Sequence, residues 1–70
     1  MNYWDQLRNY LQLKVSTQEY DNWIRGTSFV EMHDGTLSVS VPDRETHSWM
    51  EREYSQLIRA VHGFLLIVVD

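Results

Sequence analysis

The dipeptide Asp34-Gly35 is the feature that most restricts how this chain can fold. A two-residue turn of type I′ needs positive φ at both central positions, and Asp-Gly supplies this at low cost. The run Thr36–Val41 that follows alternates strictly, with aliphatic residues on one side and hydroxyl residues on the other. Together with the β-favouring run Phe29–Met32 before the turn, this pattern predicts a β-hairpin.

A helical period precedes the hairpin. Trp4, Leu7 and Leu11 follow one another at intervals of three and four, which places them on one face of a helix. We therefore predict a first helix from Asn2 to Leu13. Its apolar face is expected to pack against the rest of the domain.

A second helix is predicted to start at the capping box Ser16–Glu19. In this motif the Ser16 hydroxyl accepts from the backbone N–H of Glu19, and the Glu19 side chain reaches back to the Ser16 amide. The helix then carries Trp23 on an apolar face. We expect Gly26 to end it in the left-handed conformation that glycine tolerates.

After the hairpin, Pro42 ends the second strand and Asp43 is a predicted N-cap of a third helix that stops at Gly63. The run Phe64–Val69 is apolar throughout, which is typical of a strand buried on both faces or covered by helices. The predicted order is α-α-β-β-α-β. Because a hairpin alone is marginal in water, we expect the last strand to complete a three-stranded sheet, with the helices covering one face of it. The fold class is α+β.

Length and composition indicate one domain over residues 1–70. A chain of 70 residues lies near the lower limit for a self-supporting core, and it has no cysteine to form a disulfide. Its hydrophobic content of 43% is enough for a compact core. The chain has neither a signal peptide nor an apolar run long enough to cross a membrane, so we expect a cytoplasmic protein without membrane contact.

The charge and the motifs argue against an enzyme. No cysteine nucleophile, GxSxG or GxxxxGK[ST] occurs, and no cofactor is expected. His47 and Glu51 lie four apart, but two ligands do not make a metal site, so no metal is expected. The acidic residues around the third helix are explained by the helix dipole. A net charge of −4 disfavours tight nucleic-acid binding and favours protein partners.

The residues quoted so far resemble domain I of DnaA, the bacterial chromosomal replication initiator. The resemblance is carried by Trp4, Tyr20–Arg25, Gly35–Val39, Val41–Arg44 and Trp49–Tyr54 in this order and spacing. It implies a small KH-like fold with three helices and three strands. It also implies a docking module that self-associates at the origin and contacts the replicative helicase DnaB and regulators of initiation. The ATPase and DNA-binding domains of such a parent protein are not in this chain.

The resemblance also assigns candidate site residues. Trp4, with Leu7 on the same face, matches the self-association helix, and packing onto the core is the alternative role for Trp4. Glu19 matches a residue of helicase and regulator contact, in addition to its capping role. Trp49 belongs to the same candidate contact. Where the family often has an aromatic residue, this chain has Glu45, so either the partner surface is basic or the contact lies elsewhere.

Two other interpretations stay open at this point. A KH-like module that binds single-stranded nucleic acid is the first alternative, although such modules use a GxxG loop that this chain lacks. At most weak contact with single-stranded DNA through exposed aromatic residues is expected. The second alternative is an unrelated small α+β domain.

Overall fold

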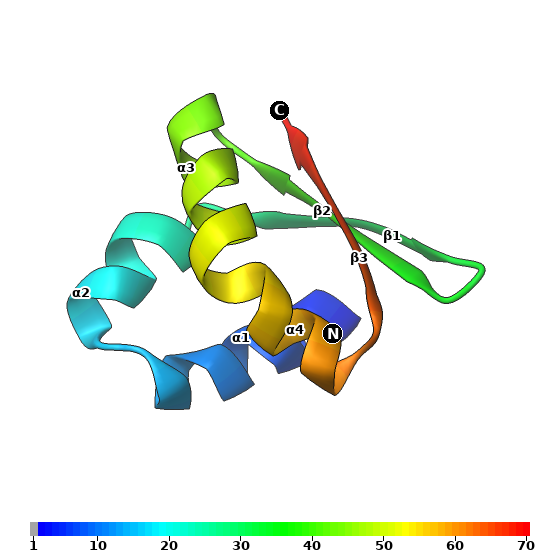
Figure 1. The fold of residues 1–70 in the computed structure, drawn as a ribbon, viewed down its shortest axis with the longest axis horizontal. Helices are drawn as coiled ribbons and strands as arrows, with labels where there is room; N and C mark the ends of the chain where they lie inside the picture. The colour runs from blue at the N-terminus through cyan, green and yellow to red at the C-terminus, as the bar shows by residue number, and fades with distance from the viewer. Residues whose placement is uncertain (1) are drawn as a thin grey trace.

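A computed structural model describes residues 2–70. It is an α+β structure with three helices and a three-stranded mixed sheet in the order α-α-β-β-α-β, as predicted (Figure 1). Two of the helices contain a π-helical turn, labelled η. The elements are α1 (Tyr3–Lys14), α2 (Thr17–Glu19), η1 (Tyr20–Ile24), β1 (Ser28–His33), β2 (Thr36–Val41), α3 (Arg44–Trp49), η2 (Met50–Tyr54), α4 (Ser55–Val61) and β3 (Phe64–Val69).

The first helix forms where its apolar spacing predicts it. Its N-cap is Asn2, whose side-chain oxygen accepts from the Asp5 amide over 2.8 Å. This bond satisfies one of the amides that a helix start leaves without an intrahelical partner. Trp4, Leu7 and Leu11 are all buried, so the predicted face is the one that packs on the core.

The second helix starts at the predicted cap and ends differently from the prediction. The Glu19 amide donates to the Ser16 hydroxyl over 3.1 Å. The helix then widens into η1, where the Arg25 amide donates to the carbonyl of Tyr20 five residues back. The left-handed conformation predicted for Gly26 is wrong, because its φ is not positive. The chain instead leaves the helix through Thr27, whose amide and hydroxyl both donate to the Ile24 carbonyl.

The hairpin is confirmed. Asp34 and Gly35 have φ of 50° and 79°, as a type I′ turn requires. β1 and β2 pair antiparallel with His33 opposite Thr36. The register shifts between Phe29 and Glu31, so β1 carries a bulge at this point. On β2 the three aliphatic residues are buried, as predicted, and Ser38 between two of them is buried as well.

The third helix runs continuously through α3, η2 and α4. Asp43 is its N-cap and accepts from the Thr46 amide over 2.8 Å, as predicted. Met50, Tyr54 and Ile58 form its buried face. Gly63, with a φ of 116°, turns the chain into β3, which confirms it as the end of the helix.

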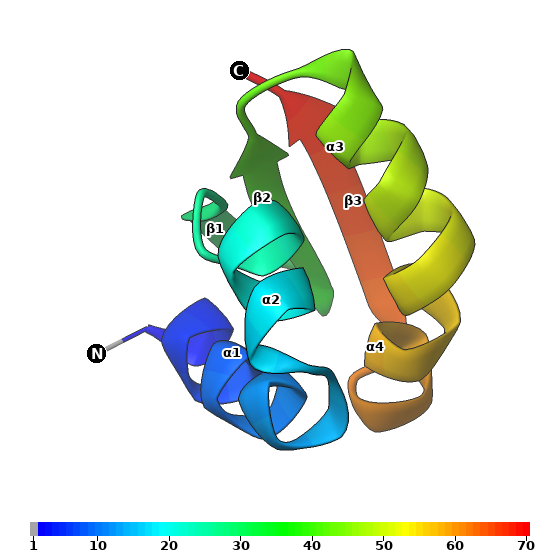
Figure 2. The ribbon, with the colours of Figure 1, turned by 90° about the vertical axis from the view of Figure 1, so that its left-hand side faces the viewer.

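β3 lies beside β2 and parallel to it, with Leu65 opposite Leu37 and Ile67 opposite Val39. The strand order β1-β2-β3 makes β2 the central strand. Figure 2 shows the helical segments on one side of the sheet. Burial on both faces of β3 is therefore not found: Leu65 and Ile67 are buried under the helices, whereas Phe64 is 68% exposed. The helices cover one face of the sheet and leave the other open.

One hydrophobic core joins the helices to the covered face of the sheet. Its members are the buried aromatic and aliphatic residues Trp4, Leu7, Leu11, Ile24, Leu37, Val39, Val41, Met50, Tyr54, Ile58, Leu65 and Ile67. None of the helices within residues 2–70 has the length and apolar character needed to cross a lipid bilayer.

Candidate protein-interaction site

The second and third helices meet through two tryptophans. The rings of Trp23 and Trp49 stack with centroids 4.7 Å apart and an interplanar angle of 11°. Trp23 lies in η1 and Trp49 directly precedes η2, so both helices contact each other at their widened turns. The Arg52 guanidinium lies 5.4 Å from the Trp49 ring centroid, where a cation is attracted to the ring face. Both indoles are half-buried, so this contact reaches the surface.

Glu19 joins the same two helices by a hydrogen bond. The Tyr54 hydroxyl donates to Glu19 Oε2 over 2.8 Å, and the Ser16 hydroxyl donates to Glu19 Oε1 over 3.4 Å. The predicted bond from the Ser16 amide to this carboxylate is not found among the described residues, and the Glu19 oxygens accept from the two hydroxyl groups instead. Burial raises the pKa of the Tyr54 hydroxyl above its ordinary value, and the nearby Glu19 charge acts in the same direction.

Glu45 lies in the first turn of α3 and is exposed. It precedes Trp49 by four residues, and residues at this spacing are neighbours on a helix surface. In the same way Glu19 precedes Trp23 by four residues on the second helix. The three residues predicted for helicase and regulator contact therefore lie along one seam, which we define as Glu19, Trp23, Glu45, Trp49 and Arg52.

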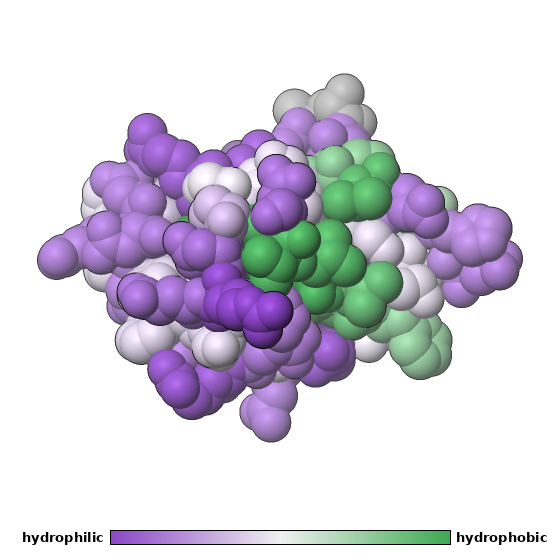
Figure 3. All heavy atoms as spheres, turned by 90° about the horizontal axis from the view of Figure 1, so that it is seen from above, coloured by the Kyte–Doolittle hydropathy of each residue, from purple (hydrophilic) through white to green (hydrophobic). Residues whose placement is uncertain are grey.

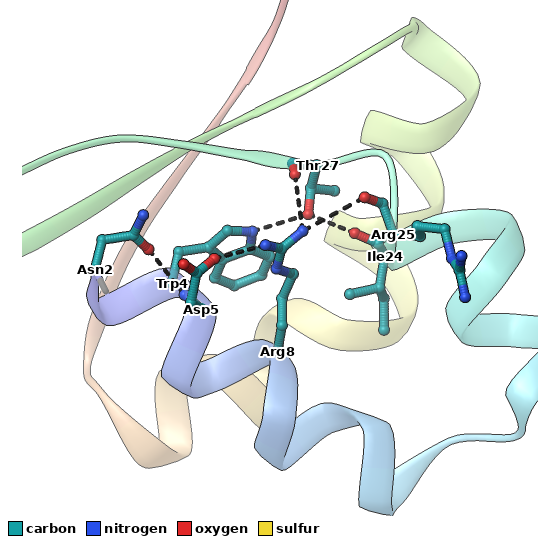
Figure 4. A network of polar contacts seen from close by, with 7 residues as sticks. All are labelled: Asn2, Trp4, Asp5, Arg8, Ile24, Arg25 and Thr27. Atoms are coloured by element: carbon teal, nitrogen blue, oxygen red, sulfur yellow. Dashed lines mark hydrogen bonds and ion pairs between the residues drawn. The ribbon is translucent and has the colours of Figure 1, made fainter.

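Trp4 and Leu7, the two residues predicted for self-association, are placed in the core. Trp4 has no exposed surface, and its indole Nε1 donates to the Thr27 hydroxyl over 2.8 Å (Figure 4). Leu7 is 4% exposed. The structure thus brings these residues to the interface of α1 with the segment before β1, separate from the seam.

Arg8 also connects α1 to the segment before β1 by hydrogen bonds. Its guanidinium donates to the carbonyls of Thr27 and Arg25 over 3.3 and 3.4 Å, and it pairs with Asp5 over 2.6 Å (Figure 4). The open surface of α1 is formed by other residues. Among them Leu13 is 84% exposed, which makes it the most exposed large apolar side chain of the described chain.

His47 and Glu51, the two residues considered for a metal site, contact different groups. His47 Nε2 lies 3.1 Å from the Ile67 carbonyl, and Glu51 pairs with Arg59 over 3.8 Å. Residues 2–70 contain no group of three His, Asp or Glu side chains placed to hold a metal ion. They also contain no pocket, so the candidate site is a surface.

Sequence reasoning did not identify the contacts made by Trp23, Arg52 and Tyr54. The only local signal was the spacing of four residues that pairs each glutamate of the seam with a tryptophan. The Tyr54 to Glu19 bond joins residues 35 positions apart, and no local pattern predicts such a pairing.

These features define a small α+β domain whose candidate site is an aromatic and acidic seam between two helices. The family model of the DnaA N-terminal domain matches residues 1–62. The chain therefore belongs to this family, the N-terminal domain of the replication initiator DnaA, which is a non-catalytic interaction domain. This confirms the resemblance found in the sequence. The matched range ends just before β3.

Proposed function

We propose that this domain is the docking module of a replication initiator, and that the seam is its contact surface for the replicative helicase DnaB and for regulators of initiation. Family membership supports the general role. The observation that carries the choice of surface is the Trp23–Trp49 stack, which holds Glu19 and Glu45 on two neighbouring helices. Aromatic residues in a defined position beside charged ones are typical of binding hot spots.

The charge of the seam determines which partner surface fits it. Glu45 replaces the aromatic residue that the family often has, and a carboxylate is costly to bury in an apolar pocket. We therefore propose that the partner presents a basic residue opposite Glu45. Glu19 contributes less charge to such a contact than Glu45, because its oxygens already accept from Tyr54 and Ser16.

Binding of the domain to the replicative helicase of the same organism tests this proposal. We expect Glu45→Lys to weaken binding by about tenfold or more, because like charges then face each other. Glu51→Lys is the matched control, since Glu51 lies two residues after Trp49, on another side of the same helix. Equal binding of Glu45→Lys and the unchanged domain would overturn the choice of surface. Equal weakening by both variants would show that only net charge matters.

We further propose that α1 mediates weak self-association, as the family resemblance implies for Trp4 and Leu7. Because both residues are buried, their part is to hold α1 in place, and the contact itself is made by exposed residues such as Leu13. Sedimentation over a concentration series should show a rise in mass that Leu13→Ser abolishes. A monomer at every concentration would contradict self-association, and a rise that Leu13→Ser leaves unchanged would contradict the role of Leu13.

A further inference from the structure

The open face of the sheet carries a second apolar surface, away from the seam. Strand alternation and register place Phe64, Leu66 and Val68 of β3 on this face, opposite Thr36, Ser38 and Ser40 of β2. Leu66 is 52% exposed, and at the bulge of β1 Val30 is 49% exposed. Seen from above, the molecule shows hydrophobic side chains gathered together with hydrophilic ones on either side (Figure 3). Contiguous exposed apolar residues of this kind mark interaction sites.

The shape of this face suits a helix. The central strand presents only hydroxyl side chains, of which Ser38 is buried, whereas β3 presents Phe64 and Leu66 and β1 presents Glu31 and His33. Neighbouring strands lie about 4.8 Å apart, so the open-face rows of β1 and β3 are separated by about 10 Å. An α-helix with its side chains has a diameter of about 10 Å. A helix can therefore lie along β2 with its apolar side between the two rows.

Two backbone acceptors on the free edge of β3 are already occupied by side chains. The Asp70 amide donates to the Val41 carbonyl, so the even-numbered residues of β3 direct their backbone groups towards β2. The odd-numbered carbonyls point to the free edge, where Leu65 accepts from Arg59 over 3.3 Å and Ile67 lies 3.1 Å from His47 Nε2. These side chains occupy the acceptors that a pairing strand needs. The available surface is the face and not this edge.

The distribution of charge indicates which class of partner fits the open sheet face. All six Lys and Arg residues lie within residues 8–25 or 44–59, the helical parts of the chain. Apart from His33, which pairs with Asp34, the charged residues of the sheet segments are acidic, with Glu31 opposite Ser38 on the open face and Asp70 directly after β3. Two copies meeting face to face would bring like charges together without any Lys or Arg to offset them. A basic partner meets complementary charge at Glu31 on β1 and at Asp70 after β3.

From these observations we propose that the open sheet face binds an amphipathic helix of a partner protein, with an apolar stripe flanked by Lys and Arg. The stripe lies along β2 and contacts Phe64 and Leu66 of β3. The basic residues lie near Glu31 and Asp70. This proposal concerns a different surface from the seam and does not depend on the function proposed for it.

A synthetic peptide of Leu, Ala and Lys serves as the probe. It is about 18 residues long, because shorter helices are marginal in water, and its leucines follow helical spacing. The control peptide has Glu in place of every Lys. Binding is measured by fluorescence anisotropy, and the bound surface is located by chemical-shift changes in the 15N-labelled domain. We expect the Lys peptide to bind, the Glu peptide not to bind, and the shifts to fall on β1, β2 and β3.

Two variants of the face and one matched control complete the test. We expect Leu66→Ser and Phe64→Ser each to weaken binding by about tenfold or more, because each removes a large apolar contact. Both side chains are more than half exposed, so the fold should persist, as the amide spectrum will show. Val61→Ser removes an exposed valine from α4 and should leave binding unchanged.

Several results would overturn the proposal. They are absence of binding, equal binding of the Lys and Glu peptides, shifts confined to the helices, and equal binding of Leu66→Ser and the unchanged domain. A mass that rises with concentration in the absence of peptide, and that Leu66→Ser keeps at the monomer value, would identify a second copy as the occupant. None of these results changes the expected effect of Glu45→Lys on helicase binding, so the two proposals fail separately.

Discussion

The indole Nε1 of Trp4 donates a hydrogen bond to the Thr27 hydroxyl over 2.8 Å, with both side chains buried. The Thr27 hydroxyl in turn donates to the Ile24 carbonyl over 2.6 Å. This chain of two bonds joins α1, the end of η1 and the start of β1. A residue that the family resemblance associates with self-association is thereby part of the fold itself.

We predict that Trp4→Ala destabilises the domain by about 3–5 kcal/mol, because it leaves a large cavity in the core. A domain of this size has a total stability of roughly 4–10 kcal/mol, so this variant loses much of it. Thr27→Val keeps the shape but leaves the Trp4 N–H without an acceptor, and should cost about 1–3 kcal/mol. Urea unfolding measures both changes. An unchanged midpoint for Trp4→Ala would contradict the described packing.

This loss of stability affects how a self-association experiment with Trp4→Ala is interpreted. If Trp4→Ala abolishes association, the loss of fold explains the result as well as the loss of a contact does. Leu13→Ser separates the two explanations, because an exposed side chain contributes little to the core.

For Tyr54→Phe we predict a loss of about 1 kcal/mol, since the bond to Glu19 disappears and the ring stays in place. Tyr20→Phe is the matched control, because no described hydrogen bond involves the Tyr20 hydroxyl. The raised pKa of Tyr54 gives a second measurement. Subtracting the alkaline absorbance titration of Tyr54→Phe from that of the unchanged domain should isolate a tyrosine that ionises above the ordinary pKa of about 10. A difference titration at or below that value would contradict the described environment.

Local features of the fold were predictable from the sequence. The Asp34-Gly35 turn, the Asp43 cap and the amide bond to Ser16 each involve residues no more than three positions apart, so a short segment contains the whole signal. The apolar faces of the first and third helices follow from spacing alone. For these elements, local preference and the final fold agree.

The errors arose where distant parts of the chain decide the outcome. The apolar run of β3 left open burial on both faces or cover by helices, and the packing of all helices on one side of the sheet is what leaves Phe64 and Leu66 exposed. Glu19 was expected to complete a local capping box, yet it accepts from Tyr54 on another helix. The Trp23–Trp49 stack that organises the seam likewise depends on how two helices meet. Sequence spacing indicates which residues share a face, but not what that face contacts.

Gly63 and Gly26 are predicted to respond oppositely to alanine. Gly63 has a φ of 116°, which side chains rarely adopt, so Gly63→Ala should cost about 1–3 kcal/mol. Gly26 has no positive φ, and an added Cβ would lie 3.8 Å from Pro42 Cγ, an ordinary contact. Gly26→Ala should therefore be close to neutral, because it restricts the unfolded chain without straining the folded one. Thermal unfolding compares the two, and a larger loss for Gly26→Ala would contradict the described backbone.

The Asp43 cap predicts how stability depends on acid pH. The pKa of Asp43 is lowered because the Thr46 backbone amide, and then the Thr46 side chain, donates to its carboxylate. The folded state therefore binds this proton less readily than the unfolded state does. The stability that the charged cap confers is fully present above the ordinary aspartate pKa of about 4, and is lost as the pH falls through the lowered folded value.

Asp43→Asn isolates this contribution, because asparagine is also a good N-cap but does not titrate. At neutral pH we expect Asp43→Asn to unfold close to the temperature of the unchanged domain, whereas Asp43→Ala unfolds at a lower temperature. Below the aspartate pKa, the difference in melting temperature between the unchanged domain and Asp43→Asn should shift in favour of asparagine. Thermal melts at several pH values give this difference directly. If it stays constant across the acid range, the carboxylate of Asp43 does not cap α3 in solution.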